Sequence, residues 1–282
     1  MKTAVLHRKK ELTKMAGRIR ATCVQMAFDA KESHISSALS CVEILTALYG
    51  GFLNYYDGAK SCNQDRDRFI MSKGHGCSAL YATMAAFGII PVEMLKKYSQ
   101  NDSALPNHPC KHALPHLEIS SGSLGHGLGI AAGILYGLRL SHNLKSKAVV
   151  LLSDGECNEG SVWEAAMFAA AQKFTNLLAI VDNNGSQAVG RSDVIMGFTS
   201  LEEKFRSFGW DAISVNGNDI NSLVAALEKF PFSPDKPSAI IAKTVSGAGV
   251  SFMEKEQVWF YRTPSRDDLD KALMEIGEKP VY

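Results

Sequence analysis

Short, fully apolar runs alternate with longer mixed segments in the second half of the chain. Residues 148–152 (AVVLL) and 177–181 (LLAIV) are apolar at every position, which is typical of parallel strands buried on both faces. Residues 161–172, between these runs, are predicted as a helix. Alternating strands and helices predict an α/β fold, a parallel sheet with helices on both faces. The other expected elements are strands at 211–215 and 238–243 and helices at 125–140, 201–208, 222–230 and 266–276.

The first half of the chain is less regular. Residues 9–30 and 36–50 carry apolar side chains at helical spacing and are predicted as helices. Residues 100–121 contain three prolines among scattered histidines and serines, which indicates a long ordered loop. A loop of this length inside a compact domain is usually functional.

Length and charge narrow the class of protein. The 282 residues suit one large α/β domain or two small ones. We assign residues 1–245 to one domain and 246–282 to its C-terminal tail. Because the net charge is only +1, nothing indicates a nucleic-acid or anionic-membrane partner. No apolar stretch in the sequence is long enough to span a bilayer.

The N-terminal segment and the cysteines point to the cytoplasm. Residues 1–20 are basic and polar and lack the apolar centre of a signal peptide. The cysteines are widely spaced and form no CxxC pair, so we expect reduced thiols that mostly serve packing. They are Cys23, Cys41, Cys62, Cys77, Cys110 and Cys157.

Polar residues follow the two apolar runs directly. Asp154 and Gly155 follow the first run after Ser153, and Asn184 follows the second after Asn183. The 30 positions from Asp154 to Asn184 hold one helix and one strand, which is a single right-handed βαβ unit. Both side chains are therefore expected at the carboxyl edge of neighbouring strands, where ligands bind in open α/β sheets.

The residue types at that edge suit a hard cation. A carboxylate and an amide oxygen can share one ion with the Ser186 carbonyl, and all-oxygen coordination suits Mg²⁺ or Ca²⁺. Mg²⁺ keeps positions for phosphate oxygens, and the helix expected after Gly155 directs its N-terminal amides at the same anion. These residues predict a metal-bridged diphosphate site. The spacing alone is also compatible with an ordinary strand-end Asp and an Asn-Asn-Gly turn.

Four longer segments resemble transketolases, thiamine-diphosphate-dependent enzymes. Asp154-Gly155 followed about thirty residues later by Asn-Asn resembles the thiamine-diphosphate motif. The resemblance runs from about Lys10 to the C-terminus and matches the family's N-terminal, diphosphate-binding domain. The segments are SDGECNEGSVWEAAMFAAAQKFTNLLAIVDNNG, DRFIMSKGHGCSALYA (67–82), SSGSLGHGLGIAAG (120–133) and GAGVSFME (247–254).

The resemblance implies a role for each matching residue of the cofactor site. Asp154 and Asn184 would ligate the metal through their side chains, and Ser186 through its carbonyl. The amide of Gly155 would bind the diphosphate. The other cofactor contacts implied are His75 at the phosphates, Gly122, Ser123 and Leu124 around the two rings, and Glu156.

Histidines and glutamates complete the implied active site. His34 and His108 match histidines of the substrate channel, and with His75 they would serve proton transfer as neutral imidazoles. Glu159 and Glu164 match acidic residues that join two active sites across a dimer interface. Glu164 lies among alanines and aromatic residues, so we expect it to be buried and to need a partner.

The resemblance further implies ketol transfer with thiamine diphosphate and a divalent metal. A two-carbon fragment would pass from a ketose, such as a sugar phosphate, to an aldose, with the cofactor as electron sink. In the family a second domain carries the glutamate that activates the aminopyrimidine, and no segment here resembles it. We therefore expect a separate C-terminal transketolase subunit, which carries the pyrimidine-binding domain, and a heterotetramer with two copies of each chain.

Several positions depart from the family pattern. Ser153 replaces a glycine, which a small hydroxymethyl group should allow. Asn107 replaces the glycine before His108, and the residues around His34 replace much of a Gly-Pro-Gly pattern. Phe260 stands where relatives commonly have the histidine of a Trp-His pair. Because phenylalanine cannot donate a hydrogen bond, this departure bears on the substrate or the rate and leaves the cofactor site intact.

Other functions are compatible with parts of the sequence. The chain could belong to a 1-deoxyxylulose-5-phosphate synthase-like or a 2-oxoacid-decarboxylating thiamine enzyme, although the KGH, GSLGHG and NEGSVWEA segments favour transketolase. Phe260 is the best support for a non-catalytic cofactor-binding subunit. The G-x-G-x-x-A pattern from Gly127 to Ala132 follows no clear strand, so it indicates close packing and not dinucleotide binding. His108, Cys110, His112 and His116 suggest zinc, but the intervening prolines oppose the helix that such spacing needs.

Overall fold

A parallel sheet forms the centre of the protein. The computed structural model describes residues 2–55, 65–143, 145–197 and 199–282. Within these residues the main sheet has five strands in the order β1-β2-β3-β7-β6, and every neighbouring pair is parallel. The predicted fold class is therefore confirmed. The strands are β1 (Arg68–Met71), β2 (Ala148–Ser153), β3 (Leu177–Asn183), β6 (Asp211–Asn216) and β7 (Ser238–Lys243).

The two apolar runs are central strands buried on both faces. In β2, Val149 and Leu151 pack into one hydrophobic cluster, while Val150 and Leu152 pack into a second cluster on the other face. Successive side chains of a strand point to opposite faces, so a strand covered twice must be apolar at every position. This is the physical reason that β2 and β3 read as continuous apolar runs.

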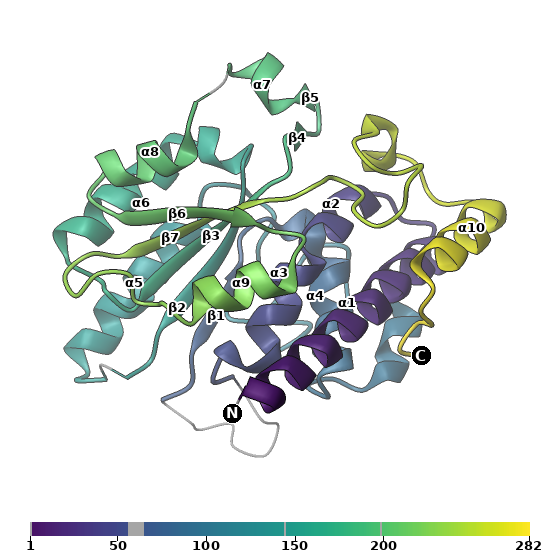
Figure 1. Cartoon of the computed structure of the whole chain (residues 1–282), viewed down its shortest axis with the longest axis horizontal. Helices are drawn as coiled ribbons and strands as arrows, with labels where there is room; N and C mark the ends of the chain where they lie inside the picture. The colour runs from purple at the N-terminus through teal and green to yellow at the C-terminus, as the bar shows by residue number, and fades with distance from the viewer. Residues whose placement is uncertain (1, 56–64, 144, 198) are drawn as a thin grey trace.

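Which face of the sheet a helix covers depends on the direction in which the chain moves along the sheet between successive strands. Helices α5, α6 and α8 cover one face, where the chain crosses from β1 towards β6, and α9 lies on the other, where it returns to β7 (Figure 1). Right-handed crossovers require this division. Helices α1 to α4 join α9. The bounds are α1 (Lys2–Ala30), α2 (Ile35–Ser40), α3 (Val42–Ala47), α4 (Cys77–Ala86), α5 (Gly127–Leu140), α6 (Gly160–Ala171), α8 (Leu201–Ser207) and α9 (Ile220–Leu227).

The predicted helix at 36–50 is interrupted. It divides at Cys41 into α2 and α3, and it ends in a π-helical turn at Leu48–Phe52 in which Gly51 has a φ of 134°. The hydroxyl of Ser40 lies 3.0 Å from the carbonyl of Ser37 and 2.6 Å from Asp182 Oδ2, and a serine side chain within reach of the nearby backbone can compete with the helix. The break places Ser40 beside the ends of the central strands, where the functional residues gather.

Some elements carry too weak a pattern to be predicted. Strand β1 and the first part of helix α4 lie within a segment singled out above only for its motif, and the small hairpin of β4 and β5 follows β3. Figure 1 shows that hairpin and α7 projecting from the sheet beyond β3. Residues 100–121 form an irregular loop, as expected. The remaining bounds are β4 (Ser186–Gln187), β5 (Gly190–Arg191), α7 (Ser192–Ile195) and the 3₁₀ turns Gly74–Gly76, Val92–Lys97, Glu156–Asn158 and Gln257–Phe260.

The C-terminal tail packs against the first helix. Helix α10 (Arg266–Ile276) begins with a capping box between Ser265 and Asp268 and lies beside α1 (Figure 1). Among the described helices, none has the length and hydropathy needed to cross a membrane. The described cysteines are all free thiols, and Cys62 lies outside the described residues.

Candidate functional site

The ends of β2 and β3 bring Asp154 and Asn184 to the same edge of the sheet. Ser153 is paired with Asp182 in the register of these strands. The Asp154 amide donates to the carbonyl of Asp182 at 3.2 Å, and the amide of Gly185 donates to Asp154 Oδ2 at 3.1 Å. The two proposed metal ligands therefore leave adjacent parallel strands and meet in one cluster.

The carboxylate of Asp154 has one satisfied oxygen and one unsatisfied oxygen. Oδ2 accepts from Gly185 and from the Ser192 hydroxyl at 2.7 Å, whereas Oδ1 is buried without a hydrogen-bond partner. Burial raises the pKa of Asp154, although the Ser192 bond opposes this effect. A buried carboxylate with an unpartnered oxygen needs a positive charge. This oxygen fits a divalent cation.

Asn184 and Ser186, the other two candidate ligands, lie in the same cluster. Asn184 Oδ1 accepts from the Ser186 amide at 2.9 Å, and Asn184 Nδ2 donates to Ser40 Oγ at 3.2 Å. Asp154, Asn184 and Ser186 all line a cavity of about 440 Å³ that Arg191 and Lys255 also border. The cavity is large enough for a diphosphate group. Arg191 at its margin is paired with Asp193, which also lines the cavity, and Lys255 is the other basic residue of the lining.

The three histidines predicted from the sequence form a second group. The ring centroid of His34 lies 6.4 Å from that of His75 and 6.2 Å from that of His108. The backbone amide of His34, whose φ is 62°, donates to the carbonyl of Phe260 at 3.1 Å. Residues from distant parts of the chain thus meet, and the backbone carbonyl of Phe260 lies beside His34.

Their environment keeps these histidines neutral. Burial, followed by the charge of Lys73, lowers the pKa of His75 well below its ordinary value. Burial and the neighbouring His108 lower the pKa of His34, and burial lowers that of His108. Neutral imidazoles can both accept and donate protons at neutral pH.

Two close backbone approaches hold the motifs together. A Cβ atom at Gly74 would lie 3.0 Å from the backbone of Ser121, and one at Gly122, where φ is 151°, would lie 3.1 Å from the His108 ring. Ser123 is exposed and Leu124 is half-buried beside this contact. The loop of His75 and the loop of Gly122 therefore pack on each other, as their common assignment to the cofactor requires.

Both carboxylate oxygens of Glu156 form hydrogen bonds with groups of the protein. Its carboxylate accepts from the Gly125 amide at 2.8 Å, from the Ser153 amide at 3.2 Å and from the Ser72 hydroxyl. The side chain is fully buried, so it joins three loops below the site. Ser153 fits as expected, because its hydroxyl accepts from the Glu156 amide at 3.3 Å.

The segment after Gly155 differs from the prediction. A 3₁₀ turn, Glu156–Asn158, separates Gly155 from α6, which begins at Gly160. A Cβ atom at Gly155 would lie 2.8 Å from Cγ of Gln187, so only glycine allows this side chain to pack there. The N-terminal amides next to Gly155 belong to that short turn and not to the helix.

The expectation that Glu164 is buried is wrong for this chain. Glu164 is exposed on α6, and Glu159 before the helix is exposed too. Exposed apolar side chains surround this face of α5 and α6, and the ring centroids of Tyr136 and Phe168 are 6.1 Å apart. We call this surface the α5–α6 face. Its large apolar residues are Ile130, Tyr136, Leu140, Met167 and Phe168.

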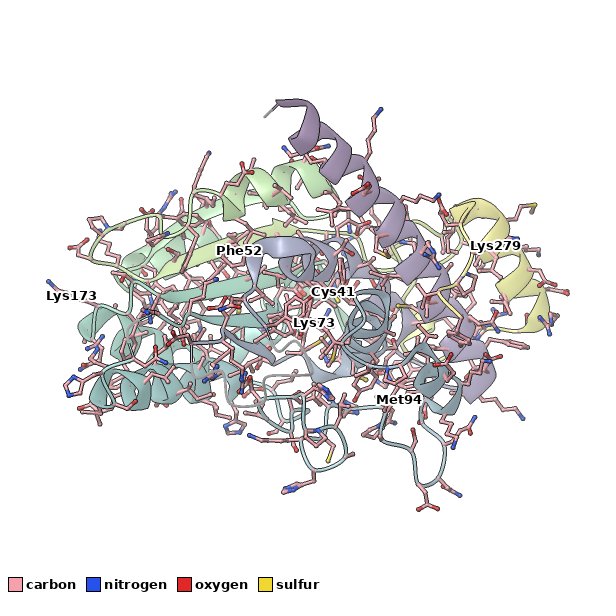
Figure 2. The ribbon with its side chains drawn as sticks, turned by 90° about the horizontal axis from the view of Figure 1, so that it is seen from below. Cys41, Phe52, Lys73, Met94, Lys173 and Lys279 are labelled. Carbon is pink, nitrogen blue, oxygen red and sulfur yellow. The ribbon has the colours of Figure 1, made fainter. Side chains whose placement is uncertain are left out.

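A buried ion pair that sequence reasoning missed lies between the two groups. Lys73 and Asp182 are both fully buried and form an ion pair; Lys73 lies near the middle of the molecule in Figure 2. Burial alone would lower the pKa of Lys73, but the charge of Asp182 raises it. The available signal was a charged residue at the end of an apolar strand, since Asp182 directly follows Val181.

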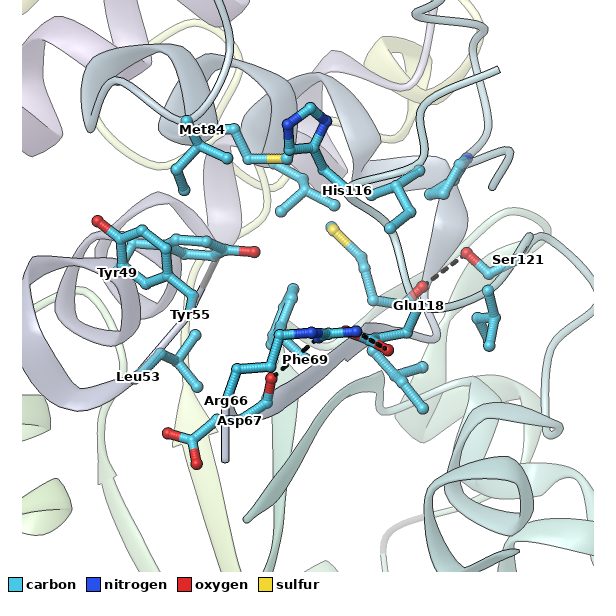
Figure 3. A pocket seen from close by; sticks show the side chains of 17 residues that line it. Tyr49, Leu53, Tyr55, Arg66, Asp67, Phe69, Met84, His116, Glu118 and Ser121 are labelled. Carbon is cyan, nitrogen blue, oxygen red and sulfur yellow. Dashed lines mark hydrogen bonds and ion pairs between the residues drawn. The ribbon is translucent and has the colours of Figure 1, made fainter. Parts of the chain in front are cut away.

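A second cavity is too small to be the cofactor site. It measures about 40 Å³ and lies beside the Arg66–Glu118 ion pair (Figure 3), so it has room for water and not for a cofactor. The structure also offers no zinc site near His108, because no three His, Cys, Asp or Glu side chains among the described residues gather as metal ligands.

Comparison with known sequences identifies the family. Residues 12–277 match the transketolase thiamine diphosphate binding domain. The chain belongs to the transketolase family. It is 41% identical to an apulose-4-phosphate transketolase subunit of Actinobacillus succinogenes, over 95% of this chain and 97% of that one. It is 36% identical to a 6-deoxy-6-sulfo-D-fructose transketolase subunit of a Clostridium species, over 78% and 80% of the two chains.

Full-length transketolases are similar over less than half of their length. Human transketolase is 34% identical over 93% of this chain and 41% of its own. The crystal structure of Campylobacter jejuni transketolase superposes with a TM-score of 0.86 at 27% identity, covering 96% of this chain and 43% of that one. Within the family, this transketolase chain therefore corresponds to the cofactor-binding domain.

The environment of His75 leads to a pH prediction. The unfolded chain binds a proton at His75 near the ordinary pKa of about 6.5, whereas the folded chain takes it up only at much lower pH. Above pH 6.5, His75 is neutral in both states and does not change the free energy of unfolding. Below that pH only the unfolded chain binds the proton, so the free energy of unfolding falls. In an NMR titration, the His75 ring resonance should not titrate between pH 8 and about pH 6. A midpoint near 6.5 would contradict the structure.

Proposed function

We propose that this chain is the thiamine-diphosphate- and metal-binding subunit of a two-subunit transketolase. It transfers a two-carbon ketol group from a ketose, or ketose phosphate, to an aldose. The unsatisfied Oδ1 of buried Asp154, beside Asn184 at the strand edge, carries the proposal. Residues 12–277 match a thiamine diphosphate binding domain, which supports the proposal that this edge holds the cofactor.

The oxygen atoms at the edge suit a divalent metal. Asp154 Oδ1 would supply the charged ligand, and Asn184 Oδ1 and the Ser186 carbonyl would supply neutral ones. Hard oxygen ligands with a single carboxylate favour Mg²⁺, with Ca²⁺ as the other candidate. Lys255 at the margin of the cavity suits the negative diphosphate, whereas Arg191 is already paired with Asp193.

The remaining residues support the reactive end of the cofactor. Thiamine diphosphate supplies, when bound, the electron sink for breaking and forming the carbon–carbon bond. The neutral imidazoles of His34, His75 and His108 can exchange protons with the hydroxyl and carbonyl groups of a sugar. Gly122 and Leu124 would contact the cofactor rings.

A second polypeptide would complete the active site. Two of the relatives aligned over most of their own length are named as transketolase subunits. The α5–α6 face is apolar and exposed, which is costly in water without a partner, and Glu164 lies on it. We infer that this face and the site edge contact further subunits, with two copies of each chain in the assembly. Free thiols at the described cysteines fit a cytoplasmic enzyme.

The substrate would differ from the usual ketose phosphates if Phe260 shapes the pocket. The names of two relatives contain apulose-4-phosphate and 6-deoxy-6-sulfo-D-fructose, so members of the family are named after different sugars. Phe260 is buried, with only 4% of its surface exposed, and its carbonyl holds His34. The residue is placed to influence which sugar fits beside the histidines.

The first prediction concerns the metal site. Replacing Asp154 with alanine removes the only charged metal ligand proposed, so metal-dependent binding of thiamine diphosphate should be lost. Calorimetry with thiamine diphosphate and Mg²⁺ measures this binding. Asp235→Ala, an exposed site in the loop before β7, is the control and should bind normally. Unchanged affinity in Asp154→Ala would exclude this metal site.

The second prediction concerns Phe260. A hydrogen bond to a charged group contributes about 1.5–3 kcal/mol, or roughly ten- to a hundredfold in rate if it forms in the transition state. Phe260→His should therefore raise the activity of the complete enzyme on ordinary ketose phosphates. Steady-state kinetics with several donors is the measurement. A large loss with every donor would show that Phe260 shapes a pocket for a different substrate.

The third prediction tests the function itself. The purified chain should show no ketol transfer alone, because the activating glutamate of the family lies on the other domain. Adding a chain with the pyrimidine-binding domain should restore transfer, measured with ketose-phosphate donors and, for comparison, pyruvate. Full turnover by the isolated chain would refute the two-subunit proposal. Turnover with pyruvate alone, or cofactor binding without any turnover in the complete assembly, would refute the transketolase proposal.

A further inference from the structure

A chain of buried hydrogen bonds runs from the ion pair to the proposed metal ligand Asn184. Asp182 Oδ2 accepts from Lys73 Nζ and, at 2.6 Å, from the Ser40 hydroxyl. Ser40 Oγ in turn accepts from Asn184 Nδ2 at 3.2 Å. Asp182 Oδ1 accepts from the Thr244 hydroxyl. The charge of Asp182 is therefore fully paired, and Ser40 alone connects it to Asn184.

The charge of Asp182 sets the direction of the Ser40 hydroxyl. That hydroxyl has one hydrogen, which can reach either Asp182 at 2.6 Å or the Ser37 carbonyl at 3.0 Å. The bond to a carboxylate is shorter and charge-assisted, so it is the stronger of the two. Lys73 also donates to the Ser37 carbonyl at 2.9 Å, which satisfies that acceptor. Ser40 therefore presents lone pairs, and not its proton, to Asn184.

This direction decides which end of the Asn184 amide faces the metal site. Nδ2 must point at Ser40, because only a donor can bind the lone pairs there. Oδ1 must then point the other way, where it accepts from the Ser186 amide at 2.9 Å. A flipped amide would set Nδ2 against the Ser186 N–H, donor against donor, and would lose its bond to Ser40. Two contacts at opposite ends thus specify one orientation.

We propose that Asp182 and Ser40 are positioning residues, which hold the Asn184 amide with its oxygen directed at the metal. This inference rests on the proposed function, because it assigns the orientation of one ligand of the same site. Outer hydrogen-bond partners of this kind orient metal ligands and usually change metal affinity about 10- to 100-fold when they are removed. The break between α2 and α3 follows Ser40 directly, so the local fold delivers the hydroxyl to this point.

Lys73 has a supporting role in the same arrangement. Its ammonium group neutralises Asp182, and both side chains are completely shielded from water. Removing either charge would leave the other buried and unpaired, which destabilises a fold strongly. Variants of Lys73 or Asp182 would therefore confuse loss of folding with loss of orientation. Ser40→Ala leaves the ion pair intact and is the sharper change.

The test measures Mg²⁺ affinity in the full chain. Calorimetry with saturating thiamine diphosphate should show Mg²⁺ binding about tenfold or more weaker in Ser40→Ala than in the unaltered chain. Ser238→Ala is the matched control, since Ser238 is also a fully buried serine but begins β7 at the opposite end of the sheet. Its Mg²⁺ affinity should not change. Thermal unfolding of both variants without ligands shows whether either change acts through general stability.

Repeating the Ser40→Ala change in an Asn184→Asp variant separates the orientation of the amide from other effects of Ser40. The two oxygens of a carboxylate are equivalent, so the aspartate of Asn184→Asp directs an oxygen at the metal in either orientation and does not depend on Ser40 for this. Adding Ser40→Ala to Asn184→Asp should therefore weaken Mg²⁺ binding by less than about threefold, given the usual size of such coupling energies. An equal loss in both backgrounds would overturn the proposed orientation.

The outcomes distinguish this inference from the function on which it rests. Metal-dependent cofactor binding by the unaltered chain, with Ser40→Ala within twofold of it, would overturn the inference alone. Absence of metal-dependent binding in the unaltered chain would overturn both. A selective loss of Mg²⁺ affinity in Ser40→Ala, with unfolding temperatures matching the Ser238→Ala control, would support the inference.

Discussion

Burial of the sheet on both faces is the constraint on which the site depends. Strands β2 and β3 have no solvent-facing side, so polar side chains can follow them only where the strands end. The parallel register sets Ser153 beside Asp182, so the polar residues at the carboxyl ends of both strands lie at the same edge of the sheet. Asp154 and Asn184 meet at that edge because each directly follows the end of one of these two neighbouring strands.

Charge at that edge has to be balanced away from water. Asp154 and Asp182 are both buried, and one cation from the protein, Lys73, forms an ion pair with Asp182. Asp154 keeps an unsatisfied oxygen, and this oxygen is the reason that we propose a further cation at the edge. The same lysine lowers the pKa of His75, which couples the electrostatics of the metal ligands to those of the histidines.

The outer surface shows a different kind of incompleteness. The α5–α6 face exposes large apolar side chains, with Leu140 and Met167 at 67% and 52% of their surface. Glu164 lies among them in water and not in a core. Its apolar sequence neighbours indicated burial, whereas the structure leaves it exposed beside the apolar side chains of this face.

The sequence by itself determined the fold class, the central strands and most helices, because continuous apolar runs and helical spacing are local patterns. It also singled out Asp154, Asn184 and the three histidines as candidates, through their positions at strand ends and through family motifs, and the structure brings the members of each group together. It did not identify Lys73, Asp182 or Ser40 as a unit. These residues lie more than thirty positions apart in the chain, and hydrogen bonds between them exist only after the strands and α2 pack together. The break at Cys41 and the exposure of Glu164 likewise depend on which neighbours surround each residue, and that was decided by the tertiary structure.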